Sequence, residues 1–321
     1  GNSSGHVRVY QNESGTWTQI GQPIEGEAAN DWSGGVVSLS ADASTVAIGA
    51  RGNDGNGNSS GHVRVYQNES GTWTKIGQDI DGVIDYEYMG SGASLSSDGS
   101  ILAVGAYNNN DNGLRSGRVR IYQNESGTWT QLGQDLDGEA AYDNSGWSVS
   151  LSADGSIVAI GATNNDNDNG YNSGHVRVYK NVSGTWTQIG QDIDGEAGND
   201  LSGHSVSLSS DGSIVAIGAY FNDGNGANSG HVRVYQNVSG TWTQIGADLD
   251  GEAANDFAGR SVSLSPDGSI VAIGARGNDG NGNDSGQVRM FKYSSFNITT
   301  SVIELRAAGF TAPELRAAGF T

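Results

Sequence analysis

One segment of 56 or 57 residues is copied along most of this 321-residue chain. A tryptophan in the motif Gly-Thr-Trp-Thr marks each copy, at Trp17, Trp73, Trp129, Trp186 and Trp242. The segment His-Val-Arg-Val-Tyr, or a close variant, marks the copies again, starting at His6, His62, Arg118, His175, His231 and Gln287. A repeat of this length is typical of proteins whose copies bury their apolar sides by stacking on one another.

Each copy contains four short segments that read as β-strands. Apolar and polar residues alternate in His-Val-Arg-Val-Tyr, Thr-Trp-Thr-Gln-Ile and Ser-Val-Ser-Leu-Ser, which predicts strands with one buried face. The run Ile-Val-Ala-Ile-Gly-Ala is apolar throughout, which indicates a strand buried on both faces. Turn residues separate the segments, and no helical period appears before residue 300. The sequence therefore predicts an all-β fold, a β-propeller of four-stranded antiparallel blades.

The copies predict five full blades and one half-blade over residues 1–299, with a fourth strand of the last blade at 296–300. The half-blade leaves an open sheet edge, and such edges favour pairing. Upstream repeats, a ring with one thin blade, or a neighbouring subunit could each complete it. Among these we expect a six-bladed ring.

A different pattern occupies residues 300–321, where Glu-Leu-Arg-Ala-Ala-Gly-Phe-Thr occurs twice. Ser301 with Glu304, and Thr311 with Glu314, have the spacing of a helix capping box. Two short helices are predicted. They would form either a cap on the last blade or a docking tail, because helices this short need a surface to cover.

Composition excludes several classes of function. The formal charge is −20, from 16 basic and 36 acidic residues, which makes nucleic acid and anionic lipid poor partners. No apolar run is long enough for a membrane helix, so membrane insertion is not expected. The chain has no cysteine, which excludes disulfides and thiolate sites.

The segments Phe257-Ala-Gly and Gly274-Ala-Arg, on either side of a strand pair, resemble the FG-GAP repeat of integrin-α-type propellers. Degenerate forms of both segments recur in the other copies, so the resemblance covers residues 1–292. It implies the propeller fold. The calcium hairpin of that family falls where this chain has only a short turn at 153–156, so calcium is not carried over to that position.

No catalytic motif such as Gly-x-Ser-x-Gly or His-Glu-x-x-His is present. The histidines that begin His-Val-Arg-Val-Tyr lie at one repeat position, too far apart to share a ligand, and we interpret them as strand-start residues bonded to a turn. His204 has no counterpart in other copies and is interpreted as a surface variation. We therefore expect no enzyme.

Two acidic patterns suggest calcium, because Ca²⁺ prefers oxygen ligands at alternate positions. One is the Asn/Gly-rich loop, for which an ordinary glycine-rich turn is the alternative. Its candidate ligands are Asp54, Asn56, Asn58, Asp166, Asp168, Asp223, Asn225, Asp279, Asn281 and Asn283. The other is the acidic loop at Asp192, Asp194 and Glu196, which also fits an alternating strand edge. No other cofactor is indicated.

A glycosylation sequon recurs in the hairpin of every copy, conditional on a eukaryotic secreted source. Its asparagines are Asn12, Asn68, Asn124, Asn181 and Asn237. Deviant loops offer Tyr86, Tyr88 and Tyr171 as candidate ligand contacts.

Taken together, these patterns predict a non-enzymatic extracellular or cell-surface protein with a structural or adhesive role in an assembly or filament. Its expected partners are other copies of itself, surface proteins or glycans. The alternatives are a carbohydrate- or protein-binding module and a polysaccharide-cleaving propeller.

Overall fold

The computed structural model describes residues 2–293. These residues form 25 β-strands and no helix, which confirms the all-β prediction. The predicted strand at 296–300, the two predicted helices and the predicted boundary at residue 300 lie outside the described residues. No helix within residues 2–293 is long and apolar enough to cross a membrane.

The first complete blade has the predicted four strands, in the order β3 (Val36–Leu39), β4 (Thr45–Ala50), β5 (His62–Glu69) and β6 (Thr72–Lys75). All neighbours pair antiparallel. A fifth, very short strand, β7 (Ile80–Asp81), pairs with the start of β5. The acidic loop that follows such a blade therefore begins as a short strand. Its alternating pattern is open to two interpretations, calcium ligands or a strand edge, and its first residues form a strand edge.

Three more copies repeat this blade. The second contains β8 (Gly92–Leu95), β9 (Ile101–Ala106), β10 (Arg118–Glu125), β11 (Thr128–Gln131) and β12 (Leu136–Asp137). The third contains β13 (Ser145–Leu151), β14 (Ile157–Ala162), β15 (His175–Val182), β16 (Thr185–Gln188) and β17 (Ile193–Asp194). The fourth contains β18 (Ser205–Leu208), β19 (Ile214–Ala219), β20 (His231–Val238), β21 (Thr241–Gln244) and β22 (Leu249–Asp250).

The two ends of the described chain carry incomplete blades. At the N-terminal end, β1 (His6–Glu13) and β2 (Thr16–Glu25) form a hairpin equivalent to the third and fourth strands of a blade. At the other end, β23 (Ala258–Leu264), β24 (Ile270–Ala275) and β25 (Gln287–Lys292) form a three-stranded fifth blade.

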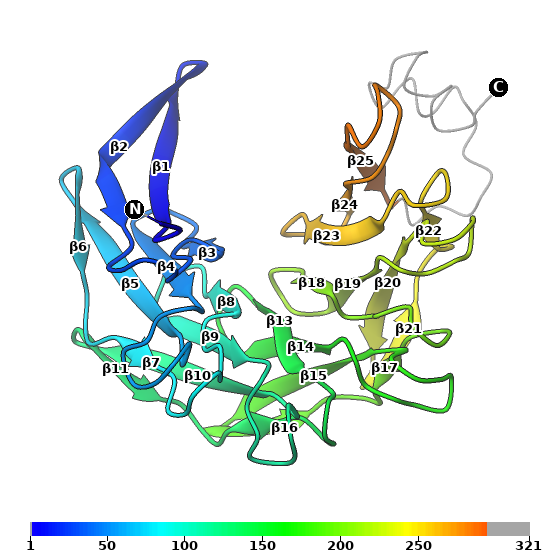
Figure 1. The fold of residues 1–321 in the computed structure, drawn as a ribbon, viewed down its shortest axis with the longest axis horizontal. Coiled ribbons are helices and arrows are strands. Elements are labelled where there is room, and N and C mark those ends of the chain that lie inside the picture. The colour runs from blue at the N-terminus through cyan, green and yellow to red at the C-terminus, as the bar shows by residue number, and fades with distance from the viewer. Residues whose placement is uncertain (1, 294–321) are drawn as a thin grey trace.

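The blades follow one another around an arc (Figure 1). The first strand of each blade lies on the concave side, and the fourth strands lie on the outside. The arc is open between the β1–β2 hairpin and the fifth blade. A five-bladed propeller with an extra hairpin is thus observed, and the predicted six-bladed ring is not supported, because the described strands form no sixth blade and no closure.

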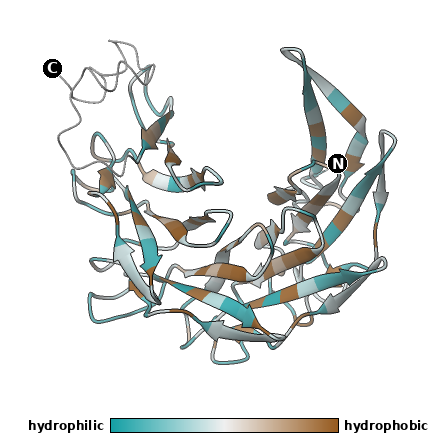
Figure 2. Ribbon diagram, turned by 180° about the vertical axis from the view of Figure 1, so that it is seen from behind, coloured by the Kyte–Doolittle hydropathy of each residue, from teal (hydrophilic) through white to brown (hydrophobic). Residues whose placement is uncertain are grey.

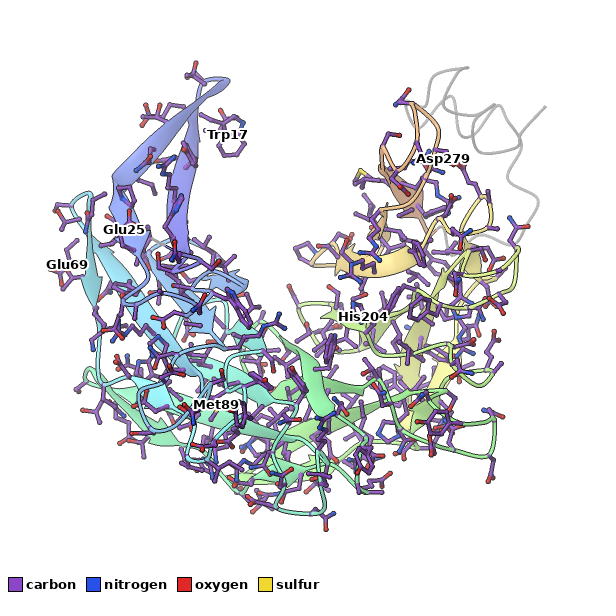
Figure 3. The ribbon with its side chains drawn as sticks, viewed as in Figure 1. Trp17, Glu25, Glu69, Met89, His204 and Asp279 are labelled. Atoms are coloured by element: carbon purple, nitrogen blue, oxygen red, sulfur yellow. The ribbon has the colours of Figure 1, made fainter. Side chains whose placement is uncertain are left out.

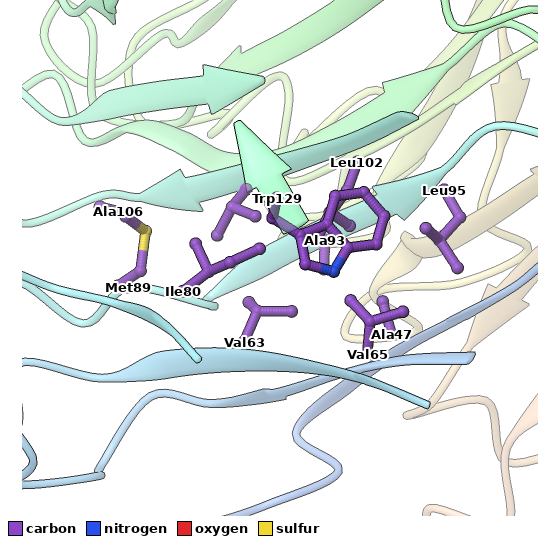
Figure 4. Packing of buried hydrophobic residues seen from close by; sticks show 11 residues of the cluster. Ala47, Val63, Val65, Ile80, Met89, Ala93, Leu95, Leu102, Ala106 and Trp129 are labelled. Atoms are coloured by element: carbon purple, nitrogen blue, oxygen red, sulfur yellow. The ribbon is translucent and has the colours of Figure 1, made fainter. Parts of the chain in front are cut away.

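The hydrophobic core lies between neighbouring blades. Along the strands, hydrophobic and hydrophilic residues alternate (Figure 2), so each blade has apolar side chains to pack against its neighbour. One such cluster joins Val63 and Val65 of the first blade to Leu102 and Trp129 of the second (Figure 4). Each blade is therefore stabilised by its two neighbours.

Glycine permits the closest approach between blades. Gly105, in the Gly-Ala pair that ends β9, lies against the backbone of Gly146 in the third blade. A Cβ atom at Gly105 would stand 2.0 Å from the Gly146 carbonyl oxygen. This contact recurs at the next two junctions, so the Gly-Ala pair of the repeat is explained by packing between backbones.

Candidate active site on the inner face of the arc

Two kinds of loop meet at the same end of the blades. One runs from the outer strand of a blade to the inner strand of the next, and the other joins the second and third strands. In the third blade, Leu201 N donates a hydrogen bond of 3.2 Å to Asn172 O, and Gly174 forms a parallel bridge with Ser202. Leu201 adopts a left-handed conformation, with φ of 54°. The equivalent residues of the other copies, Trp32, Tyr88, Asn144 and Phe257, have φ of 54–57°, so this conformation belongs to the loop of the repeat.

Aromatic rings are in contact along this end of the inner strands. Tyr107 stacks on Tyr88 with ring centroids 5.4 Å apart, and lies 4.8 Å from Trp147. Trp147 lies 5.5 Å from His204, which lies 4.2 Å from Tyr220. Tyr220 in turn lies 6.3 Å from the ring of Phe257. We call these six residues the aromatic belt: Tyr88, Tyr107, Trp147, His204, Tyr220 and Phe257.

Arginine side chains lie over aromatic rings at both ends of this region. The guanidinium carbon of Arg260 lies 5.4 Å from the ring centroid of Tyr220, and that of Arg276 lies 5.0 Å from the ring of Phe257. Near the other end, Arg51 lies 5.3 Å from the ring of Trp32. Positively charged arginine side chains therefore lie next to apolar ring faces at the ends of the belt, although the chain as a whole is acidic.

His204 occupies the middle of the belt, on the inner side of the arc (Figure 3). The imidazole is half-buried. Burial first, and then the charges of Arg260 and Arg276, lower its pKa to about 4. At neutral pH the ring is uncharged and can accept a proton. The interpretation of His204 as a surface variation did not include these contacts, because Trp147, Arg260 and Arg276 come from neighbouring blades and only Tyr220 from its own.

The belt is also where the copies of the repeat differ. One position carries Gly35, Ser91, Trp147, His204 and Arg260 in successive copies. A second carries Arg51, Tyr107, Thr163, Tyr220 and Arg276. The packing residues, by contrast, are nearly identical from copy to copy. The belt is thus an asymmetric surface on a repeating scaffold, which makes it a candidate for a single site.

A hollow of about 560 Å³ lies beside the two arginines of the fifth blade. This volume is in the range of small-molecule sites. Its lining includes Arg260, Ser261, Arg276, Ser285, Gln287 and Val288. We call it the edge hollow, because it lies at the open end of the arc. It extends the positively charged end of the belt with hydroxyl and amide groups.

Two of the three tyrosines predicted as ligand contacts lie at the belt. Tyr88 belongs to it, and Tyr86 lies 6.4 Å from Tyr88 between ring centroids. Tyr171 is 68% exposed, in a loop of the third blade, and makes no ring contact within the described residues. Their role in ligand binding stays a prediction, as do the predicted partners.

The Asn/Gly-rich loops use most of the predicted calcium ligands for turn hydrogen bonds. The first carboxylate of each loop accepts a backbone N–H, as Asp54 does from Ser59 at 2.7 Å. Asp166, Asp223 and Asp279 do the same. Asn56 and Asn225 donate to the carbonyl oxygens of Gly82 and Gly251.

The remaining predicted ligands are placed less uniformly. The backbone N–H groups of Asn58 and Asn281 donate to Asp85 and Ser285, and the Asn283 amide donates to Asp284. Asp168 contributes to raising the pKa of Asp194, after burial of that carboxyl and the charge of Asp192. A calcium site in these loops stays a prediction.

The sequon asparagines also stabilise turns. Asn12, Asn68, Asn124, Asn181 and Asn237 each accept a hydrogen bond from the glycine three residues later, at 2.8–2.9 Å. The Nδ2 atoms of Asn68, Asn181 and Asn237, where a glycan would be attached, are buried and without a partner among the described residues. Whether these sequons carry glycans stays a prediction.

Histidine and carboxylate groups converge at three blade junctions. Each group contains a glutamate from one blade and a histidine and an aspartate from the next, with potential ligand atoms within 4.8 Å of one another. They are Glu27, His62 and Asp79; Glu139, His175 and Asp192; and Glu196, His231 and Asp248. Such groups could hold a metal ion. The sequence predicted the histidines and the acidic loops separately, and did not bring them together.

Comparison with known proteins supports the repeat and the fold. Residues 136–179 and 245–291 match the model of the FG-GAP repeat. No curated protein matches the chain. Among solved structures, the periplasmic gluconolactonase of Pseudomonas aeruginosa is 19% identical, with a TM-score of 0.59, and the match covers 89% of this chain and 75% of that one.

Two further solved structures are described as candidate 6-phosphogluconolactonases. The protein from Bacteroides uniformis is 12% identical, with a TM-score of 0.48 and coverage of 90% of this chain and 88% of that one. The protein from Bacteroides fragilis is 14% identical, with a TM-score of 0.47 and coverage of 92% and 88%.

The gluconolactonase neighbour contradicts the expectation of a non-enzymatic structural or adhesive protein acting in a filament, because it is named as a lactonase, which is an enzyme. At this identity the likeness establishes the fold, and the chemistry must be argued from the chain's own residues. The chain thus has a β-propeller fold, and two of its segments, 136–179 and 245–291, match the FG-GAP repeat.

Proposed function

We propose that this chain is an enzyme that hydrolyses a lactone of a sugar or a similar polyhydroxylated compound at the aromatic belt. The observation that carries the proposal is His204, an uncharged imidazole with two guanidinium groups nearby on a surface of aromatic rings. A solved propeller of the same fold is named as a gluconolactonase, which supports the choice of reaction class.

His204 is suited to the role of general base. The low pKa keeps the imidazole unprotonated at neutral pH and also makes it a weak base, so the proton of the water moves to it only while the water bonds to the carbonyl carbon. That water attacks the lactone carbonyl carbon, and negative charge develops on the carbonyl oxygen. The ring C–O bond then breaks, and the proton held by His204 passes to the departing oxygen. The product is the open-chain hydroxy acid.

Arg260 and Arg276 are suited to binding the negative charge formed in this reaction. A guanidinium group stabilises an oxyanion through charge-assisted hydrogen bonds, and the same groups bind the product carboxylate. The partly exposed rings of Trp147 and Phe257 offer apolar faces for the C–H side of a sugar ring. The buried ring of Tyr220 supports His204 from behind. The edge hollow, with Ser261 and Gln287, provides room and hydrogen-bonding groups for the remaining hydroxyls.

The proposal includes an exported location, supported by the periplasmic neighbour. Export is the more general part of the predicted extracellular location. The proposal does not include attachment to the cell surface.

Hydrolysis of glucono-δ-lactone and of a panel of other sugar lactones, followed by pH-stat and corrected for the spontaneous rate, tests the function. Wild-type protein should accelerate hydrolysis of at least one lactone, and His204→Gln should lower kcat by about 10²- to 10⁴-fold. His6→Gln, in an exposed histidine far from the belt, is the matched control. Absence of acceleration on every lactone, or full activity in His204→Gln, would show that the proposal is wrong.

A further inference from the structure

We propose that two blade junctions each bind one divalent transition-metal ion such as Zn²⁺. One site consists of Glu139, His175 and Asp192, and the other of Glu196, His231 and Asp248. Neither site shares a residue with the aromatic belt, so the inference does not rest on the proposed lactone hydrolysis.

Three ligand atoms converge at each site. His175 Nδ1 stands 3.8 Å from Asp192 Oδ2, and His231 Nδ1 stands 3.8 Å from Glu196 Oε2. Four-coordinate zinc with bonds of about 2.0–2.2 Å places its ligand atoms roughly 3.4 Å apart. A small inward movement of the side chains is therefore enough to hold the ion. The carboxylates are partly exposed, which leaves the site open to an ion from solvent.

Neighbouring residues already hold the outer oxygens of these carboxylates. At the first site, Arg177 pairs with Glu139 Oε1 at 3.2 Å, and Gln188 donates to Asp192 Oδ1 at 2.6 Å. At the second, Arg233 pairs with Glu196 Oε1 at 3.2 Å, and Gln244 donates to Asp248 Oδ1 at 2.6 Å. The other oxygen of each carboxylate remains for a ligand. Outer partners of this kind orient metal ligands in known sites.

The buried imidazole itself indicates a missing partner. His175 is only 1% exposed, and its Nε2 atom has no hydrogen-bond partner within the described residues. Its Nδ1 atom faces Asp192 from beyond hydrogen-bonding distance. Buried polar groups are rarely left unsatisfied, because desolvation is then uncompensated. Nδ1, the ring atom nearest Asp192, also makes no hydrogen bond to the described residues, so it is the atom that can bind an ion.

The second blade shows what happens when the ligands are lost. There Val83 stands at the position of Glu139, and Arg118 stands at that of His175. The aspartate remains as Asp135, and Arg118 Nη1 pairs with its Oδ2 at 3.1 Å. Two ligands are thus replaced together at one junction, and a permanent cation takes the place next to the remaining carboxylate. A cation thus lies beside the aspartate even where the other two metal ligands are absent, as expected if the junction needs a positive charge to balance its carboxylate.

The first blade provides the internal control. The oxygens of Asp79 accept from Arg64 at 3.0 and 2.6 Å, and Oδ1 also pairs with Lys75 at 2.7 Å. Lys75 stands where the two proposed sites have Gln188 and Gln244. Both oxygens are therefore engaged by cations. A metal ion would have to displace these pairs, so we expect no site at His62.

The ligand set indicates the kind of metal. One imidazole and two carboxylates are common ligands of zinc and of related first-row divalent ions. Calcium prefers six to eight oxygen ligands, which these junctions do not offer. Three protein ligands also leave a coordination position for water.

Isothermal titration with ZnCl₂ of protein first treated with a chelator tests the proposal. Wild-type protein should bind two ions, His175→Gln and His231→Gln one each, and the double variant none. His62→Gln is the matched control and should still bind two. A wild type without these sites, a folded double variant that still binds two ions, or loss of one ion in His62→Gln would overturn the proposal. So would tighter binding of CaCl₂ than of ZnCl₂.

A second variant tests the same inference by gain of a site. Arg120 holds both oxygens of Asp135 at 3.0 and 2.9 Å. The combination Val83→Glu, Glu87→Asp and Arg118→His gives the second blade the residues of the third, including the glutamate with which the equivalent Arg177 pairs, so that Arg120 can release one oxygen of Asp135. The folded variant should bind three zinc ions, with a higher Tm in ZnCl₂ than without it, because a ligand that binds only the native state stabilises it. A variant with an unchanged circular dichroism spectrum and still only two ions would show that the ligands are assigned wrongly.

Discussion

Trp73 Nε1 donates a hydrogen bond of 2.9 Å to the carbonyl oxygen of Ile20, which belongs to the preceding hairpin. The equivalent tryptophans Trp129, Trp186 and Trp242 make the same bond to the blade before them. They are 3–4% exposed, whereas Trp17, which has no preceding blade in the described chain, is 67% exposed. The tryptophan of the repeat is thus packed against a preceding blade or hairpin in four copies and is exposed to solvent in one.

This difference predicts unequal effects of one substitution. Trp129→Ala should lower the free energy of unfolding by about 3–5 kcal/mol, because it leaves a cavity between two blades. Trp17→Ala should change it by less than about 0.5 kcal/mol, as expected for an exposed site. Urea denaturation followed by circular dichroism measures both. Equal destabilisation by the two variants would contradict the packing described between blades.

A buried ion pair in the second blade predicts another large effect. Arg118 is 2% exposed and pairs with Glu87, which is fully buried. Glu87→Gln should lower the free energy of unfolding by about 3–5 kcal/mol, since it leaves the guanidinium without its buried partner. Glu69→Gln, in an exposed hairpin, is the control and should have little effect. Equal stability of the two variants in urea would show that Asp111 and Asp135 suffice to balance Arg118.

The lowered pKa of His204 predicts a pH dependence of stability. Its pKa is about 4 in the folded chain, against a reference value of 6.5, so between these values the unfolded chain binds more protons. Stability should therefore fall as the pH is lowered from 6.5 to 4, by about 1.4 kcal/mol per pH unit for this one group. His204→Gln should reduce that slope in urea denaturation across this range. An unchanged slope would mean that the imidazole titrates normally.

The hairpin turns predict the state of the sequons. Because Nδ2 of Asn68, Asn181 and Asn237 is buried, these asparagines should carry no glycan when the chain is secreted from a eukaryotic host. Peptide mass spectrometry of the folded, secreted protein measures this. Asn68→Ala should also destabilise the chain by about 0.5–1.5 kcal/mol, through loss of the bond to Gly71. Full occupancy at Asn68 would require a different turn.

The sequence predicted the blades because their causes are local. Alternation, turn residues and the fixed period identify the four strands of each copy, and the open half-blade follows from where the copies start. For the very short strands such as β7, the sequence allows two interpretations, a strand edge and a calcium-binding loop. Two residues with alternating character fit a strand edge and a loop equally well, and only pairing with β5 decides between them.

The aromatic belt could not be predicted in the same way. Trp147 and His204 stand at the same position of different copies, and their contact depends on the curvature of the arc. The metal candidates depend on it too, because Glu139 comes from the copy before that of His175. One signal is present in the sequence: Val83 and Arg118, at the two sides of one junction between copies, both depart from the repeat. Paired departures of this kind indicate residues that meet in space.

Four consecutive blades contribute rings to the belt, although each blade is otherwise packed only against its immediate neighbours. Separate blades could unfold one at a time, as units of a linear array do. A substrate seated across the belt would touch several of them at once and would be lost if any one opened. Occupation of the site would thus couple the opening of blades that do not touch one another in the free protein, so that the chain melts as one body.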